Sequence, residues 1–466
     1  LRWMRIKVKG LGPIAEGEVE LGDLTVFFGP PNSGKSTLLR AIYYSLFPPV
    51  PGNVEGNSVD LGALRLEYSV EGNNYSFRLF PSLSYLKSLL PEGEVHAEPS
   101  FVKFVEENAL FDRFEGKASV GTLFLPSGCE GVQALKEVEY SVEVSGKSGR
   151  VGLRLSLDSV KPECRGPLLL ELARTVMPDV GKRIVGKFME RFSEHLRGTE
   201  GFSEAVFIPY FRSLVTYELL TTGVTIGGGG RSSAAQIVSP HFLDLIFTLI
   251  SLAGVVSKVK DLETYLVRLA GVKSINERVY GIVKPLIPGE VKALDGRLVY
   301  EEGGKAIPWN LVSASITEAM SLLLSVGENQ LVLYEEPESQ LYEGLQVLMA
   351  LTLYALSSFN RLVITTHSQT ILYTLAYVSF ARPSAEEVKR LLDSLGVKGG
   401  EGLARAVEEA NRSRVRFYYF HGGKVEEKRD EEIIDGIPDV VEIMRREFDW
   451  LSEVYWRRKL GAGNKG

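Results

Sequence analysis

One short segment constrains the fold of this chain more than any other: FFGPPNSGKSTLLRAIYYSLFPP, at residues 27–49. The spacing G-x-x-x-x-G-K-[ST] occupies residues 29–36, after an apolar run at 24–28 and before apolar residues at helical spacing. Pro48 and Pro49 end the predicted helix, because proline lacks the backbone N–H that a helix interior uses. A buried strand, a glycine-bearing turn and a helix are therefore predicted in direct succession.

A unit of this kind favours the binding of anions. Its turn points several backbone N–H groups into one hollow at the positive end of the helix dipole, where phosphate oxygens bind. We expect Lys35 to reach the β- and γ-phosphates of a nucleotide and the Ser36 hydroxyl to bind Mg²⁺. A chance glycine-rich loop is the alternative, and the strand and helix beside the motif argue against it. The predicted nucleotide-binding loop comprises Gly29, Pro30, Pro31, Asn32, Ser33, Gly34, Lys35, Ser36 and Thr37.

Composition and charge limit the classes of function. The chain has 466 residues, 44% hydrophobic and 24% charged, which is typical of a globular protein of two or three domains. A net charge of −6 excludes a whole-molecule attraction to nucleic acid but not a local basic face. The most apolar run, residues 242–256, is shorter than a membrane span and contains Asp244, and residues 1–9 are charged and alternating. We expect no signal peptide, no direct membrane insertion and a cytoplasmic location.

The two cysteines, Cys129 and Cys164, are far apart in sequence and lie in no C-x-x-C or Cys/His pattern. This arrangement predicts neither a disulfide framework nor a zinc site. It suits a reducing, intracellular setting.

Alternation of apolar and polar residues predicts antiparallel elements inside an otherwise α/β chain. The opening segment has the period of half-buried strands, and further hairpins are predicted at residues 64–80, 138–157 and 291–307. Helices are predicted at residues 183–196 and 242–269 and, in part, over 85–120. No heptad pattern persists between residues 60 and 310, so no long coiled-coil arm is expected. Four glycines at 227–230 are interpreted as a loop rather than a second phosphate cradle.

A pair of acids follows a second apolar strand, in QLVLYEEPESQLYEGLQ at residues 330–346. The strand 331–334 ends in Glu335 and Glu336, and successive side chains of a strand point in opposite directions. We therefore expect Glu335 to bind Mg²⁺ and Glu336 to act as the general base for an attacking water. A pair of solvated acids at a strand end is the alternative for this motif taken alone.

Two further motifs are placed to complete this site. The apolar strand RLVITT at 361–366 ends at His367, and ligands bind at the carboxyl ends of strands in open α/β sheets. Upstream, Ser315 and Glu318 have the spacing of a capping box, with another hydroxyl at Ser313. Such a helix start binds phosphate readily, so Ser313 and Ser315 are expected to contact nucleotide. A structural histidine and a simple helix cap are the alternatives for these motifs.

Taken together, these motifs resemble the ABC-ATPase superfamily, in the branch of RecF-like, SMC-like and OLD-like ATPases. The amino end MRIKVKGLGPIAEGEVELGDLTVFFGPPNSGKSTLL is similar to that branch, YEEPESQL resembles its acid motif, and VITTHSQTIL resembles its strand and histidine switch. The resemblance covers roughly the first fifty residues and residues 286–375.

The resemblance implies a role for each matching residue. These are phosphate binding for Lys35, Mg²⁺ binding for Ser36 and Glu335, base catalysis for Glu336 and γ-phosphate sensing for His367. Residues 337–340 would lie at a dimer interface, where residues 313–315 form the signature that reaches the partner's nucleotide. ATP and Mg²⁺ are the implied cofactors.

The sequence departs from that branch in several places. Ser315 stands where the signature usually has glycine, which crowds the approach to phosphate. No glutamine precedes Gln133, so the usual glutamine loop has no candidate. Arg212, in FIPYFRSL, is a candidate site arginine, with a surface ion-pair residue as the alternative. The tail after residue 380 lacks a glutamate-glycine strand end followed by D-x-D, so no Toprim nuclease domain is expected.

We therefore predict an α/β P-loop NTPase core, like an ABC-ATPase head, with an antiparallel β subdomain and an inserted region of helices and hairpins. The expected divisions are 1–50 and 286–380 for the core, 51–285 for the insertion and 381–466 for a carboxyl-terminal extension. The expected function is ATP hydrolysis by a homodimer that acts on DNA or a partner protein. The alternatives are a weakly hydrolysing ATP-dependent switch, a nucleotide-binding subunit of a transporter, and a nuclease effector.

Overall fold

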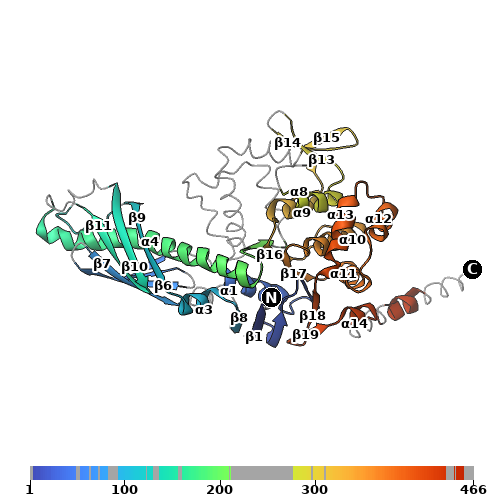
Figure 1. Cartoon of the computed structure of the whole chain (residues 1–466), viewed down its shortest axis with the longest axis horizontal. Coiled ribbons are helices and arrows are strands. Elements are labelled where there is room, and N and C mark those ends of the chain that lie inside the picture. The colour runs from blue at the N-terminus through green and yellow to red at the C-terminus, as the bar shows by residue number, and fades with distance from the viewer. Residues whose placement is uncertain are drawn as a thin grey trace, which may run out of the picture.

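The structure of the chain is a computed structural model (Figure 1). The residues that it describes are 4–48, 53–61, 64–71, 74–81, 93–121, 123–129, 136–155, 160–208, 210, 276–294, 297–308, 311–436, 446 and 448–455. Three predictions fall outside these residues, namely the site arginine Arg212, the glycine loop 227–230 and the helix 242–269.

The larger sheet joins strands from both ends of the chain. Among the described residues it has nine strands, in the order β12-β16-β17-β3-β18-β19-β2-β1-β8. Their bounds are β12 Glu204–Ile208, β16 Gln330–Glu335, β17 Arg361–Thr366, β3 Leu24–Phe28, β18 Val415–His421, β19 Lys424–Lys428, β2 Ile14–Glu20, β1 Arg5–Leu11 and β8 Glu94–Glu98. The strands from β12 to β18 run parallel to one another, and β1, β2 and β8 form an antiparallel margin.

The central strands β3 and β17 are buried along their whole length because both faces of the sheet are covered. Phe27 and Val363 pack with helix α1 (Lys35–Leu46) on one face. Val26 and Ile364 pack on the other face with helices that follow in the chain. Those helices are α8 Glu277–Val283, α9 Ala314–Ser325, α10 Glu343–Leu356, α11 Gln369–Ala381, α12 Ala385–Ser394 and α13 Glu401–Glu409, and α14 Asp430–Ile434 packs against α11. This is the α/β P-loop core that the sequence predicts.

A second sheet projects from the core as an arm (Figure 1). Its strand order is β4-β5-β6-β7-β11-β10-β9, and all its pairings are antiparallel. The bounds are β4 Asn53–Glu55, β5 Ser58–Asp60, β6 Leu64–Glu71, β7 Asn74–Pro81, β9 Leu110–Ser119, β10 Glu137–Gly146 and β11 Ser148–Arg154. The 38-residue helix α4, Pro162–Thr199, packs its apolar side against this sheet. The predicted hairpins at 64–80 and 138–157 are confirmed.

Other local predictions have mixed outcomes. The hairpin at 291–307 is confirmed as the three-stranded sheet of β13 Glu290–Leu294, β14 Arg297–Glu302 and β15 Lys305–Pro308. The helix predicted at 183–196 is confirmed as part of α4. The partly helical interpretation of 85–120 holds only for α3, Phe101–Glu107, because β8 and β9 occupy most of the other described residues there.

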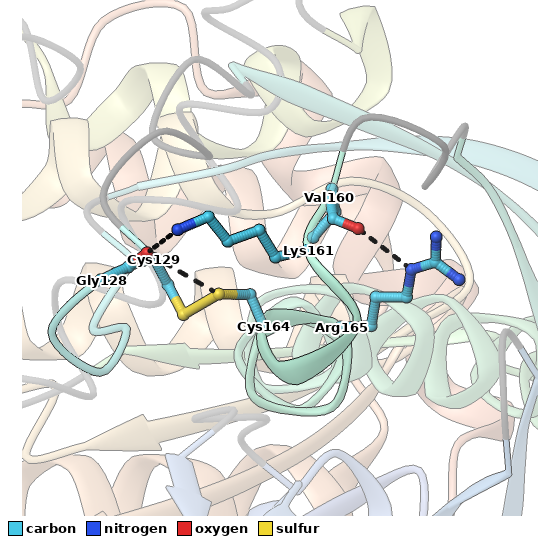
Figure 2. Close-up of a disulfide and its surroundings, with 6 residues drawn as sticks. All are labelled: Gly128, Cys129, Val160, Lys161, Cys164 and Arg165. Atoms are coloured by element: carbon cyan, nitrogen blue, oxygen red, sulfur yellow. Dashed lines mark hydrogen bonds between the residues drawn. A yellow bond between two sulfur atoms is a disulfide. The ribbon is translucent and has the colours of Figure 1, made fainter.

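The prediction from the cysteines is wrong. Cys129 and Cys164 form a disulfide, with their Cα atoms 5.7 Å apart. Figure 2 shows the bond joining a loop to the first turn of α4, beside a Lys161 Nζ to Gly128 carbonyl contact of 3.5 Å. The fold brings these residues together across a separation of 35 positions, which no spacing rule in the sequence reveals.

The carboxyl-terminal segment contributes directly to the larger sheet. Strand β18 pairs in parallel with β3 and forms an antiparallel hairpin with β19, which turns at Gly422 and Gly423. A capping box of Ser384 and Glu387 stands at the start of α12. The division of the chain at residues 50, 285 and 380 stays a prediction. Within the described residues, no helix combines the length and apolar character needed to span a bilayer.

Candidate nucleotide-binding site

Three neighbouring parallel strands end at one edge of the larger sheet. The register pairs Phe28 of β3 with Thr366 of β17, and Thr365 of β17 with Glu335 of β16. The loop after β3, the acids after β16 and the histidine after β17 therefore leave the sheet side by side. The carboxyl edge of such a sheet is where ligands bind in α/β proteins.

Two glycines give the phosphate loop its shape. Gly29 has φ +136°, and a Cβ atom there would lie 2.4 Å from the carbonyl oxygen of Phe420 on β18. Gly34, the N-cap of α1, has φ +98°, and a Cβ atom there would lie 2.6 Å from Ile14 Cγ1. Both the positive φ and the close packing require glycine. The loop 29–34 therefore keeps its backbone exposed to a ligand at the start of a twelve-residue helix.

Lys35 folds back over this loop. Its Nζ donates to the carbonyl oxygens of Gly29 at 2.9 Å and Pro30 at 2.8 Å, and to Ser33 Oγ at 3.3 Å. The residue is 4% exposed, and burial lowers the pKa of its ammonium to about 8, while the negative charge of Glu336 opposes that shift. The lysine is therefore still mostly protonated at neutral pH, and its ammonium lies against the carbonyl oxygens of the loop.

Glu335 is fully buried beside α1. It accepts hydrogen bonds from the Ser36 hydroxyl, from Arg40 Nη2 at 3.0 Å and from the Tyr210 backbone N–H at 3.4 Å. Burial raises the pKa of Glu335, and the positive charge of Arg40 is the main influence against that rise. A buried carboxylate next to a hydroxyl is an oxygen donor set that suits Mg²⁺, which takes one or two protein oxygens and leaves the rest to phosphate and water. Ser36 and Glu335 thus fit the ion predicted for them.

Glu336 faces a different environment from its neighbour. Its φ of +44° turns the chain away from the strand, and its N–H donates to the Thr365 carbonyl oxygen at 2.9 Å. Glu336 Oε1 lies 3.8 Å from His367 Nε2, and each side chain is about one third exposed. The two acids therefore diverge, with Glu335 against α1 and Glu336 facing the histidine.

The pKa of His367 depends on the charges of Lys35 and Glu336. Burial lowers the pKa of its imidazole, the ammonium of Lys35 lowers it further, and Glu336 together with a hydrogen bond involving the Gly29 backbone opposes these effects. The imidazole is therefore mainly neutral at pH 7. Lys35, Glu336 and His367, which come from three separate segments of the chain, thus lie close enough for their charges to influence one another.

Two contacts within this site were not predicted from the sequence, which placed Glu338 only in a segment at a dimer interface and gave Arg40 no role. Glu338 accepts hydrogen bonds from the Thr366 hydroxyl and from the backbone N–H groups of His367 and Ser368. Its signal was its place as the third acid in the E-E-P-E run. Arg40 lies four residues after Ser36, which places both on one face of α1. This spacing is the one sequence feature that could have pointed to Arg40 as part of the site.

The predicted capping box of Ser315 and Glu318 is wrong. Helix α9 begins at Ala314 with Ser313 as its N-cap, so Ser315 lies in the first turn and Glu318 is 0% exposed, inside the helix. The Ser313 and Ser315 hydroxyls lie 2.9 Å apart and bond to each other. Among the hydrogen bonds of the described residues, neither hydroxyl reaches the phosphate loop of its own chain.

No family model matches the chain, and no curated protein matches it. Solved structures that are similar to it include the SMC head domain from Thermotoga maritima, at 10% identity and a TM-score of 0.28, covering 92% of this chain and 99% of that one.

Two further solved structures are SMC heads with a partner. The SmcHead bound to the C-winged helix domain of ScpA has 11% identity and a TM-score of 0.34, covering 92% of this chain and 99% of that one. The Smc head domain with an extended coiled coil, bound to the C-terminal domain of ScpA from Pyrococcus furiosus, has 12% identity and a TM-score of 0.29, covering 95% and 99%. The strand order and the segments that follow β3, β16 and β17, rather than these scores, describe an α/β core with a strand, a glycine-bearing loop and a helix in succession.

Proposed function

We propose that this chain binds and hydrolyses ATP with Mg²⁺, in a site that a second copy of the chain completes. The observation that carries the proposal is the meeting of Lys35, Glu336 and His367 at one sheet edge, with Glu336 Oε1 3.8 Å from His367 Nε2. Phosphoryl transfer needs mainly positioning and neutralisation of charge. These three groups supply a cation, a base and a polar contact at one place.

Each group then has a defined task. The N–H groups of the loop and Lys35 hold the phosphates, and Ser36 with Glu335 would hold Mg²⁺, which neutralises charge on the phosphate oxygens. The Glu336 carboxylate orients the attacking water and accepts its proton. His367, as a neutral imidazole, hydrogen-bonds the γ-phosphate. Lys35 exchanges its present carbonyl partners for phosphate oxygens.

A homodimer accounts for the position of the signature segment. Ser313 and Ser315 sit at the amino end of a twelve-residue helix, α9, and make no hydrogen bond to the phosphate loop of their own chain within the described residues. In the proposed dimer they contact the nucleotide of the partner, and residues 337–340 lie at the interface. ATP binding closes this dimer and hydrolysis opens it. The motion would serve to move or clamp DNA or a partner protein.

The first test uses Glu336→Gln, which removes the base and keeps the shape of the side chain. We expect the kcat for phosphate release to fall by about a hundredfold or more, with ATP affinity changed little. Glu343→Gln, at an exposed acid in the first turn of α10, is the matched control and should keep the wild-type rate. Equal phosphate release from wild type and Glu336→Gln would refute the catalytic assignment.

The second test separates an enzyme from a weakly hydrolysing switch. With ATP and Mg²⁺, Glu336→Gln should elute as a dimer in size-exclusion chromatography with light scattering, because the closed state is no longer consumed. Ser315→Arg, which places a bulky side chain at the signature, should stay monomeric. A wild-type protein that dimerises with ATP but releases no phosphate would favour the switch, since Ser315 already replaces a smaller residue there.

A further inference from the structure

The acid that we assign to Mg²⁺ already pairs with a cation of the chain itself. Arg40 Nη2 lies 3.0 Å from Glu335 Oε1 and 3.3 Å from Glu335 Oε2, so one guanidinium nitrogen bridges both carboxylate oxygens. The two side chains are 16% and 1% exposed. Little water is left to screen this pair, so its attraction is much stronger than that of an ion pair at the surface.

The pair follows from the spacing on α1. Ser36 and Arg40 are one helical turn apart on the same face, and both donate hydrogen bonds to Glu335. A metal ion can therefore reach both oxygens of Glu335 only if the Arg40 guanidinium moves aside. A buried carboxylate without a positive partner is strongly unfavourable, so Glu335 needs either Arg40 or a metal ion.

We propose that Arg40 is a resident counter-cation that competes with the divalent metal for Glu335 and makes metal uptake depend on nucleotide. In the absence of nucleotide, a metal ion would have to displace the guanidinium of Arg40 from the Glu335 carboxylate. When a nucleotide is bound, its phosphates offer the displaced guanidinium a new anionic partner, and the metal gains ligands at the same time. This proposal rests on the proposed function only in taking Glu335 as the metal ligand.

The test measures Mn²⁺ binding to nucleotide-free protein by electron paramagnetic resonance. Arg40→Gln removes the charge and keeps much of the length, whereas Arg40→Lys keeps a charge. We expect Arg40→Gln to bind Mn²⁺ about tenfold or more tightly than wild type, and Arg40→Lys to stay close to wild type. Arg174→Gln is the matched control, because Arg174 forms an exposed pair with Glu171 on α4. Equal Mn²⁺ affinity of Arg40→Gln and wild type would overturn the proposal.

Thermal unfolding supplies a second readout. In EDTA, the Tm of Arg40→Gln should lie below that of wild type, and Mn²⁺ should raise it more than it raises the wild-type Tm, because the metal replaces the lost partner of Glu335. An identical response of both proteins to Mn²⁺ would contradict the proposal. If Arg40→Gln does not fold, the double variant Arg40→Gln/Glu335→Gln removes both charges, and it should fold and bind no Mn²⁺. A double variant that binds Mn²⁺ more tightly than wild type would also overturn the proposal, because it lacks the carboxylate that is proposed to hold the metal.

The two proposals fail separately. If wild type binds no ATP, the proposed ATPase function falls, while a gain of Mn²⁺ affinity in Arg40→Gln would still support the role of Arg40. If wild type hydrolyses ATP and Arg40→Gln gains no Mn²⁺ affinity, the role of Arg40 falls alone. A direct titration with a fluorescent ATP analogue in EDTA, run beside the Mn²⁺ titration, decides between these cases.

Discussion

The carboxylate of Glu338 is the clearest place to test how this site is held. The Thr366 hydroxyl donates to its Oε2 at 2.9 Å, and the backbone N–H groups of His367 and Ser368 donate to its Oε1 at 2.6 and 3.1 Å. One side chain from the segment after β16 thus fixes the turn after β17 that carries His367. We expect Glu338 to be a positioning residue that acts through His367.

The contacts set the size of the effect. A typical intramolecular hydrogen bond contributes about 1 kcal/mol net, so Glu338→Ala, which removes three, should lower the free energy of unfolding by about 3 kcal/mol. Glu338→Gln keeps one acceptor oxygen, and we expect a loss of about 1 kcal/mol. Both values come from urea unfolding followed by circular dichroism.

Kinetics separate positioning from simple destabilisation. If His367 needs this anchor, the kcat for ATP hydrolysis should fall about tenfold or more in Glu338→Ala, with the KM for ATP changed by less than about threefold. Glu338→Gln should recover most of the rate, because it still accepts a backbone N–H. A variant that loses about 3 kcal/mol of stability but keeps the wild-type kcat would refute the positioning role.

Two further predictions concern the disulfide and the histidine. Closing a loop of 35 residues contributes about 4 kcal/mol through the unfolded state, so Cys129→Ser should lower the unfolding free energy by about that amount, and reductant should do the same to wild type but not to the variant. Unfolding that is insensitive to reductant in wild type would contradict a disulfide between Cys129 and Cys164. For His367, whose folded pKa is depressed, the cost of charging it is present at low pH and disappears as pH rises through its unfolded pKa. An NMR titration should show this pKa raised by Lys35→Gln and lowered by Glu336→Gln, and shifts of one sign in both variants would contradict the geometry.

Much of the site was predictable because its motifs are local. The phosphate loop needs only a strand, a turn and a helix in succession, and Gly29 and Gly34 are required by backbone angles that the loop itself sets. The positions of Glu335 and His367 followed from two apolar strands that each end in a polar residue. Each of these patterns spans only about ten residues, so it can be recognised from the sequence alone.

Other features of the site could not be predicted in this way. Ser315 and Glu318 have the spacing of a capping box, but α9 begins one residue earlier, at Ala314, and the Glu318 side chain is buried. The packing of the helix, rather than this local spacing, therefore sets where α9 begins. The contact of Arg40 with Glu335 could be predicted only once β16 was known to lie beside α1. The disulfide could be predicted only from the course of the chain through the arm, because that course brings Cys129 next to Cys164.

Residues that are neighbours in the chain were enough to predict the α/β class, the hairpins and the strand, turn and helix that begin at Leu24. The folded chain was needed to show that β18, from near the carboxyl end, lies beside β3, and that Glu338 anchors the turn that carries His367. The physical reason is that hydrogen bonds and ion pairs between distant segments form only after the order of strands in the sheet is set. That order depends on the packing of whole faces, which no short motif records.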